Sequence, residues 1–391
     1  MRISDKKRSI KLFSLQLLSI VTGVVVTITS IGYIIFKQNA SNTEKVAKAV
    51  NQSPLRRLSS PIASASTVKL SQISEETKGS KLAYNITSSP NLSKSDKLQS
   101  IVNEAIDYIK DKKLPTKPLS ITLIDIKAKE YAGYQQEKLR YPASVAKLFW
   151  MVYLYAQIEK GILSEAEFSQ YLDSMIKKSD NEAASYIVDR FSKTEYRVSI
   201  TGDEYKNWRN KRLQVNKYFE DAGYEDINVS QKTFPIPSLK LSKAKGSDFK
   251  LRENLQKPIR NQVSTQQVAR LLYEIYENQS VSAIYSPKMA ECLTINSQTR
   301  NIKKNDKNPH EFNPVRGFLS ASLPNYVQFM GKAGWTYGSR NDAAIIATPD
   351  GKVAYILVIF GEDKAYAYDW QIFPQISKFV FNRMTSTVSR K

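Results

Sequence analysis

The sequence is poor in the two side chains that most often bind metals or form disulfides. Among its 391 residues there are one cysteine, Cys292, and one histidine, His310. A single cysteine excludes an intramolecular disulfide, and the two residues together are too few for a typical zinc site. His310 is the only candidate for a Ser-His-Asp triad, and the sequence contains no glycine-rich phosphate loop. We therefore expect no metal and no cofactor.

Acidic residues are scarce relative to basic ones. Lys and Arg number 58 against 37 Asp and Glu, which gives a formal net charge of +21. This excess favours acidic partners, namely nucleic acid, anionic lipid headgroups or acidic cell-wall polymers. A solvated basic surface without any specific partner has the same composition.

A long apolar run without charged residues occurs near the N-terminus. It spans residues 12–36 and follows a basic stub, residues 1–11. Its length suits a transmembrane helix, and the preceding positive charges predict a cytoplasmic N-terminus; a cleaved signal peptide is the alternative. Residues 37–92 are rich in Ser, Asn, Lys and Thr and predict a flexible linker. Residues 93–391 would then be periplasmic or extracellular, where we expect no nucleic acid.

Apolar periodicity predicts an α+β domain over residues 93–391. Segments rich in β-branched residues come early and late in the domain, with helical patterns between them. We expect an antiparallel sheet flanked by helices, together with an all-helical lobe. The expected strands are 120–126, 132–139, 342–348 and 353–360. The first expected helix begins after Ser95 and has its apolar residues between 98 and 109, and the later ones are 144–160, 165–177, 181–192, 265–276 and 368–383.

One short stretch, residues 141–147, places a serine and a lysine one helical turn apart. If the apolar run that begins there is helical, Ser144 and Lys147 share one face. A nucleophilic serine needs a base within hydrogen-bond reach, and a buried lysine beside another cation can be that base. A serine that only caps a core helix would have the same spacing. Two later segments, Ser179-Asp180-Asn181 and Lys332-Ala333-Gly334-Trp335, favour the catalytic interpretation.

In this order, the three motifs resemble the signature of the class A β-lactamases and the penicillin-binding proteins. The resemblance covers roughly residues 95–385 and implies a sheet flanked by an all-helical lobe, with the active site in the cleft between them. It implies that Ser144 is the nucleophile and Lys147 the base or proton relay. Ser179 would pass a proton to the leaving nitrogen, and Lys332 would lower the pKa of the relay and attract the substrate carboxylate.

The resemblance also implies how a substrate is held. Asn181 would bind the amide side chain of the substrate. The backbone amide of Ser144 and one near Trp335 or Thr336 would form an oxyanion hole, in which each donor contributes about 3–4 kcal/mol. The expected catalytic residues are therefore Ser144, Lys147, Ser179 and Lys332, and the expected substrate-binding residues are Asn181, Gly334, Trp335, Thr336 and Arg340.

Two departures from the family pattern affect the expected chemistry. Ala333 stands where the family has a Thr or Ser that binds the substrate carboxylate, and Arg340 with the hydroxyl of Thr336 or Ser339 is expected to compensate. The family also carries a loop glutamate that activates the deacylating water, whereas residues 230–237 contain no acid. Glu253 is the nearest candidate, but its spacing is wrong. We therefore expect acylation with slow deacylation.

These observations predict a membrane-anchored serine hydrolase acylated at Ser144 by β-lactams or by peptides that resemble D-alanyl-D-alanine. Two alternatives stay within this chemistry: a true β-lactamase and a peptidoglycan D,D-peptidase. A third alternative is a non-catalytic protein that binds the cell wall through a decayed hydrolase fold. The net charge and Ala333 favour this third interpretation, while the retained serine and lysines argue against it.

Overall fold

A computed structural model describes residues 82–254, 256–308 and 311–386. The basic stub, the expected transmembrane helix, most of the expected linker and His310 lie outside these residues. No helix within the described ranges is long and apolar enough to cross a membrane.

A mixed sheet of six strands forms the centre of the α+β domain. Its strand order is β1-β3-β2-β6-β5-β4, so that β4 lies at one edge. All pairs are antiparallel except β1 and β3, which run parallel with Ser93 opposite Glu130, and the expectation of a purely antiparallel sheet is corrected at this point. The strands are β1 (Ser93–Lys94), β2 (Leu119–Asp125), β3 (Glu130–Tyr134), β4 (Gln328–Thr336), β5 (Ser339–Ala347) and β6 (Ala354–Gly361).

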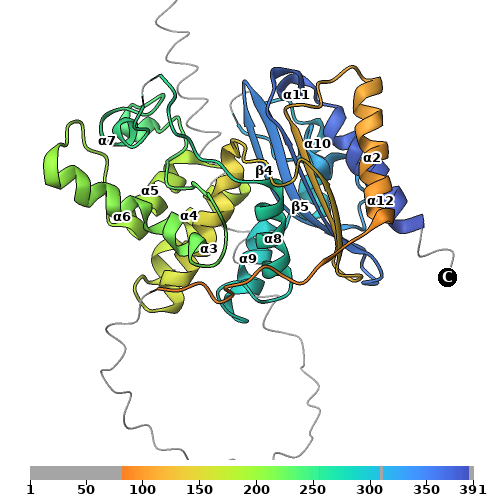
Figure 1. Ribbon diagram of the computed structural model, residues 1–391, viewed down its shortest axis with the longest axis horizontal. Coiled ribbons are helices and arrows are strands. Elements are labelled where there is room, and N and C mark those ends of the chain that lie inside the picture. Colours follow the sequence, from red (N-terminus) through yellow and green to blue (C-terminus); the bar gives the residue numbers. More distant parts are fainter. Residues whose placement is uncertain (1–81, 255, 309–310, 387–391) are drawn as a thin grey trace, which may run out of the picture. The chain divides into compact units, whose positions relative to one another are not determined.

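Helices cover both faces of this sheet (Figure 1). On one face lie α2 (Asp96–Asp111) and α12 (Ile372–Ser386), and α8 (Thr265–Tyr276) packs against the other. Along β6, the side chains of Tyr355, Leu357 and Ile359 belong to the core between the sheet and helices α2 and α12. The residues between them belong to the core on the α8 side of the sheet. Because successive side chains of a strand point to opposite faces, a continuous apolar run is buried on both sides.

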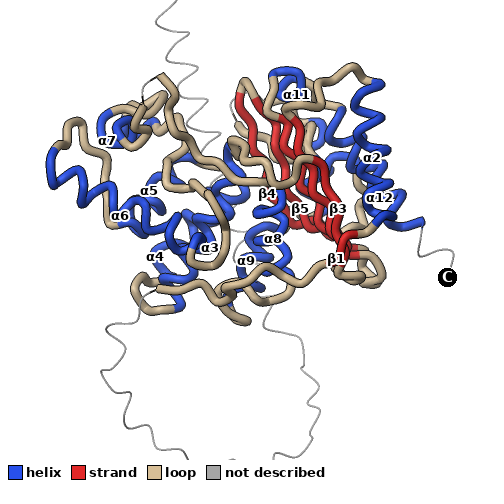
Figure 2. The backbone as a smooth tube through the Cα atoms, in the orientation of Figure 1, coloured by secondary structure: helices blue, strands red, loops and turns tan. Residues whose placement is uncertain are grey.

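The all-helical lobe is built around α3 (Lys147–Glu159), which lies apart from the sheet in Figure 2. Every residue of α3 from Lys147 to Ile158 is buried, because neighbouring helices surround it. The remaining helices are α4 (Glu165–Lys177), α5 (Asn181–Ser192), α6 (Gly202–Glu220), α7 (Gly246–Lys250), α9 (Tyr285–Leu293), α10 (Ser297–Asn305) and α11 (Lys364–Tyr368), with short 3-10 helices η1 (Ala143–Ala146), η2 (Pro237–Leu239) and η3 (Leu319–Ser322).

The segment before β1 differs from the expected flexible linker. Residues 82–92, which we call the strap, pack on the helical side of the domain instead of leaving it. Tyr84 is 4% exposed, and its hydroxyl donates to Glu274 Oε2 at 2.5 Å and to Ser280 at 3.0 Å. Arg270 donates to the backbone carbonyl of Ser88. The boundary expected at residue 93 is therefore too late.

Candidate active site

Ser144 lies in η1, immediately before α3. The expected helix start is thus a 3-10 turn, and the backbone N–H of Lys147 donates to the Ser144 carbonyl. Ala143, directly before Ser144, has a φ of +50°, which is uncommon for a residue with a side chain. Ser144 is partly exposed, and its hydroxyl makes no hydrogen bond within the described ranges. The turn therefore presents this hydroxyl to solvent at the beginning of a buried helix.

Strand β4 runs directly beside this turn. A Cβ added to Gly334 would lie 2.9 Å from both the Ser144 nitrogen and the Pro142 carbonyl oxygen, so only glycine fits at this crossing. The carbonyl of Phe329 leaves the free edge of β4 to accept from the Ile295 amide. Since residues alternate along an edge strand, the amide of Trp335 points off the same edge, toward the turn. This alternation selects Trp335 over Thr336 as the second amide donor beside Ser144.

Three side chains from separate segments meet next to α3. Lys147 Nζ donates to the Ser179 carbonyl at 2.6 Å and lies 3.4 Å from Ser179 Oγ. Lys332 Nζ donates to the same Oγ at 2.9 Å. The structure thus brings Lys147, Ser179 and Lys332 together from the helical lobe and the sheet edge, as the sequence predicts. It does not join Ser144 to them by a hydrogen bond, a contact that is often long before a ligand binds.

Burial controls the protonation of both lysines. Lys147 is fully buried, and this burial, reinforced by the nearby charge of Lys332, holds its pKa well below the usual range of a lysine. Burial also lowers the pKa of Lys332 to about 7, although the carboxylate of Asp342 opposes this shift. Both shifts favour the neutral amine over the ammonium form, because a buried charge loses its hydration. In its neutral form Lys147 has a lone pair that can accept a proton.

Asn181 connects this group to the loop of residues 230–237. Its Oδ1 accepts from Lys147 Nζ at 2.8 Å and from Thr233 Oγ1 at 2.7 Å. Thr233 is a residue of the site that the sequence analysis missed, although it lies in the loop recognised there as lacking an acid. It places a hydroxyl one hydrogen bond away from the amide that contacts Lys147.

Buried charges fix the position of this loop. Lys232 Nζ donates to Asp189 Oδ2 at 2.5 Å, and Arg212 bridges Asp189 and Asp248 at 3.2 and 3.0 Å. Breaking one partner of such a buried pair costs about 3–5 kcal/mol, so this cluster holds the loop firmly. Glu253, the nearest acid considered as a substitute, instead forms an ion pair with Arg209.

The structure differs from the sequence-based expectation for Arg340. Its side chain is 0% exposed, and its three nitrogens donate to the backbone carbonyls of Tyr366, Gly317 and Ala367 at 2.7 to 3.0 Å. The guanidinium also lies 4.2 Å from the ring of Trp370. Because these partners occupy its donors, Arg340 is placed to hold the backbone around α11 rather than a substrate carboxylate.

The end of β4 supplies other groups to the mouth of the site. The indole N–H of Trp335 donates to the Ala367 carbonyl at 2.8 Å, which fixes the ring. The hydroxyls of Thr336 and Ser339 lie 2.9 Å apart across the β4–β5 turn. Thr336 is partly exposed, whereas Ser339 is buried, and the Thr336 hydroxyl also accepts from the Gly338 amide.

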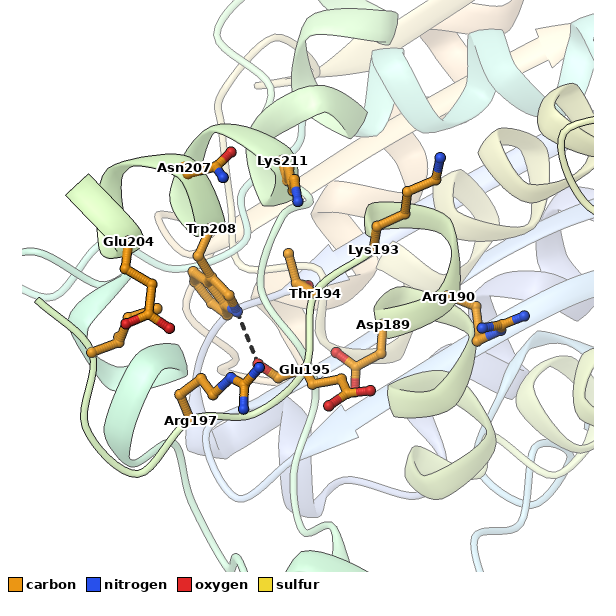
Figure 3. Close-up of a pocket in the computed structure, with 11 residues that line it drawn as sticks. Asp189, Arg190, Lys193, Thr194, Glu195, Arg197, Glu204, Asn207, Trp208 and Lys211 are labelled. Carbon is orange, nitrogen blue, oxygen red and sulfur yellow. Dashed lines mark hydrogen bonds between the residues drawn. The ribbon is translucent and has the colours of Figure 1, made fainter.

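A separate cavity of about 420 Å³ lies in the helical lobe, where α5 and α6 approach (Figure 3). Charged side chains line it, and the indole N–H of Trp208 donates to the Glu195 carbonyl across one wall. It shares Asp189 with the charge cluster behind the loop, but contains none of the expected site residues. Within the described ranges, no group of three or more His, Cys, Asp and Glu side chains is arranged to hold a metal ion.

Comparisons with known proteins agree with this architecture. A model described as the β-lactamase enzyme family matches residues 164–384, more than half of the chain. No match is found among curated proteins. The extended-spectrum β-lactamases TLA-3 and TLA-1 both align with a TM-score of 0.50 and 16% identity. The alignment with TLA-3 covers 73% of this chain and 98% of TLA-3, and the alignment with TLA-1 covers 74% of this chain and 99% of TLA-1. PBP-A aligns with a TM-score of 0.49 and 14% identity, over 76% of this chain and 100% of its own.

The matched range includes Ser179, Asn181 and Lys332, whereas Ser144 and Lys147 precede it. The hydrogen bonds from Lys147 to Ser179 and Asn181 connect the two parts. The chain belongs to the β-lactamase enzyme family.

Proposed function

We propose that this protein is a membrane-anchored hydrolase that β-lactams or peptides resembling D-alanyl-D-alanine acylate at Ser144. The observation that carries the proposal is the convergence of Lys147, Ser179 and Lys332 beside the Ser144 turn. Two amines that share one hydroxyl, both with lowered pKa values, suit proton transfer better than structural support.

In the proposed acylation, neutral Lys147 accepts the Ser144 proton while the serine oxygen attacks the substrate carbonyl carbon. The amides of Ser144 and Trp335 donate to the oxyanion of the tetrahedral intermediate. The C–N bond then breaks, and Ser179 gives its proton to the leaving nitrogen while it takes one from a neighbouring lysine. The products are an ester at Ser144 and a free amine within the ring-opened β-lactam or the released peptide.

Hydrolysis of that ester needs a base that activates water, and the loop beside the site has no acid to act as one. Thr233 and Asn181 fill the space on the loop side of Lys147 with a hydroxyl and an amide. This observation favours a penicillin-binding D,D-peptidase with long-lived β-lactam adducts over a β-lactamase with rapid turnover.

Location and partners follow from the sequence. We propose a single transmembrane helix over residues 12–36, a cytoplasmic N-terminus, and a catalytic domain in the periplasm or outside the cell. The substrate is a small molecule or a stem peptide of peptidoglycan, and the basic surface provides weak attraction to anionic cell-wall polymer. Neither nucleic acid nor a cofactor has a role in this proposal.

Intact-mass measurement after incubation with benzylpenicillin tests the nucleophile. We expect the wild type to gain the mass of one penicillin and Ser144→Ala to gain none, while Ser199→Ala, an exposed serine elsewhere, reacts as the wild type does. Equal labelling of Ser144→Ala and the wild type would remove the assignment. Wall binding by a wild type that never forms an adduct would instead support the non-catalytic alternative.

The lifetime of the adduct distinguishes the two enzymatic alternatives. We expect a long-lived penicillin adduct. We also expect slow steady-state hydrolysis of a chromogenic cephalosporin. Rapid steady-state hydrolysis would show that another group replaces the missing loop acid and would make the protein a β-lactamase.

A further inference from the structure

Two arginines lie close to the site without any carboxylate partner. The Arg260 guanidinium carbon is 5.7 Å from the ring centre of Tyr141, and that of Arg252 is 6.0 Å from the ring centre of Phe234. Within the described ranges, neither side chain makes a hydrogen bond or an ion pair, and Nε of Arg252 is buried without a partner. We call these residues the arginine pair.

Two acids of the same segment pair with other arginines, although Oδ2 of Asp248 has no partner. Glu253 pairs with Arg209 and Asp248 pairs with Arg212. The pKa of Arg252 is lowered by burial and then by the positive charge of Arg260, and these effects outweigh the opposing effects of Tyr141 and Asp248. Two like charges held together without a counterion raise the free energy of the empty state, so an anion placed between them is stabilised.

Both aromatic rings adjoin residues of the site. Tyr141 precedes Ser144 by three residues, and its carbonyl accepts from the side-chain amide of Asn341 at 3.0 Å. Phe234 directly follows Thr233, whose hydroxyl donates to Asn181. The two segments that carry the arginines are also tied together, because the Ile259 amide donates to the Arg252 carbonyl at 2.9 Å. The arginine pair thus adjoins the segments that carry Ser144 and Thr233.

We propose that the arginine pair binds a carboxylate on the acyl part of the substrate, on the Asn181 side of the bond that is cleaved. This rests on the proposed function, in which Asn181 holds the amide of the acyl side chain and the Lys332 strand attracts the carboxylate of the leaving part. The substrate class is accordingly an acidic peptide with a carboxylate ahead of the scissile bond. A guanidinium pair suits such a group, because its planar donors match the two carboxylate oxygens.

Two penicillins that differ in a single group test this proposal. Carbenicillin is benzylpenicillin with one added carboxylate on the acyl side chain. With the detergent-solubilised full chain, we expect the second-order acylation constant to be about tenfold higher for carbenicillin, the scale of one charge-assisted hydrogen bond. In the double variant Arg252→Gln, Arg260→Gln, this ratio should fall to about one while acylation by benzylpenicillin persists.

A matched double variant, Lys243→Gln, Lys257→Gln, removes the same charge from exposed positions of the same segment and should keep the wild-type ratio. Raising the ionic strength provides a test without substitution, since it should slow acylation of the wild type by carbenicillin selectively. A wild-type ratio of one, or an unchanged ratio in the arginine variant, would overturn the carboxylate site. No adduct from either penicillin would contradict the proposed function itself.

Discussion

The hydroxyl of Ser179 is the point at which the two halves of the candidate site meet. Ser179 has a φ of +57°, and from this position its Oγ reaches Lys332 while its carbonyl accepts from Lys147. A residue held in this backbone region is strained by about 1–3 kcal/mol, a cost that recurs at functional sites. The turn between α4 and α5 therefore positions Ser179 at some cost to the stability of the fold.

The positive charge of Lys332 helps to lower the pKa of Lys147. In Lys332→Met, the cation that helps to depress the Lys147 pKa is lost, so that pKa rises. Because the neutral amine is the base, the rising limb of the acylation rate should move to higher pH, and the maximum rate should fall as Ser179 loses its partner. Stopped-flow acylation from pH 5 to 9 measures both changes. An exposed control, Lys304→Met, should keep the wild-type profile, and an unshifted limb in Lys332→Met would contradict the coupling.

Thr233 offers a gain-of-function test of the missing acid. A glutamate at this position places a carboxylate on the loop side of Lys147, where it can activate water. We expect Thr233→Glu to shorten the lifetime of the penicillin adduct by about 100-fold, the usual contribution of a general base. Thr233→Gln has the same size without the base and should leave the lifetime long. Equal lifetimes in the two variants would show that the loop does not face the ester.

The strap, residues 82–92, packs on the domain in a way that the sequence does not indicate. Tyr84, Tyr224 and Arg270 all donate to the buried carboxylate of Glu274. Tyr84→Phe removes one of these donors, so we expect the free energy of unfolding to fall by about 1–3 kcal/mol. Urea denaturation measures it, with the exposed Tyr326→Phe as a control that should change stability by less than about 0.5 kcal/mol. Equal stability of the two variants would mean that the strap is only loosely attached.

Elements with strong periodicity were predicted well from the sequence. Helices α4, α5 and α8 have the bounds predicted for them, and α2 begins directly after Ser95 as predicted and extends to Asp111, because their apolar spacing reflects their buried faces. The strand predicted at 132–139 ends at Tyr134, since Gln135 takes a φ of +45°. The last helix begins at Ile372, which places Pro374 in the first turn, where a missing N–H costs little.

Several contacts between distant segments could not be predicted from the sequence. The motifs predicted that Lys147, Ser179 and Lys332 would meet, but nothing local indicated Thr233 or the burial of Arg340, which depend on how a loop and α11 pack. Strand β1 has two residues, too few for any pattern, and it pairs parallel with β3. Cys292 is partly exposed at the margin of the helical core.

For the whole molecule, the proposed location of the domain depends on the N-terminal residues. If residues 12–36 span the membrane, the full chain should remain in the membrane pellet after alkaline carbonate washing, whereas a chain that begins at residue 82 should be recovered in the supernatant. Protease added to spheroplasts should digest the domain from outside. Release by carbonate of a product that lacks the N-terminal segment would instead favour a cleaved signal peptide.

Because Lys332 titrates near neutral pH, binding of an anionic ligand should be accompanied by uptake of a proton from the solvent. An anionic ligand that approaches Lys332 raises its pKa above about 7, because a neighbouring negative charge favours the ammonium form. Each capture event at slightly alkaline pH should therefore draw a hydrogen ion from the buffer. The heat of binding should then vary with the ionisation enthalpy of the buffer, and weak affinity in alkaline surroundings would confine efficient capture to neutral or mildly acidic conditions.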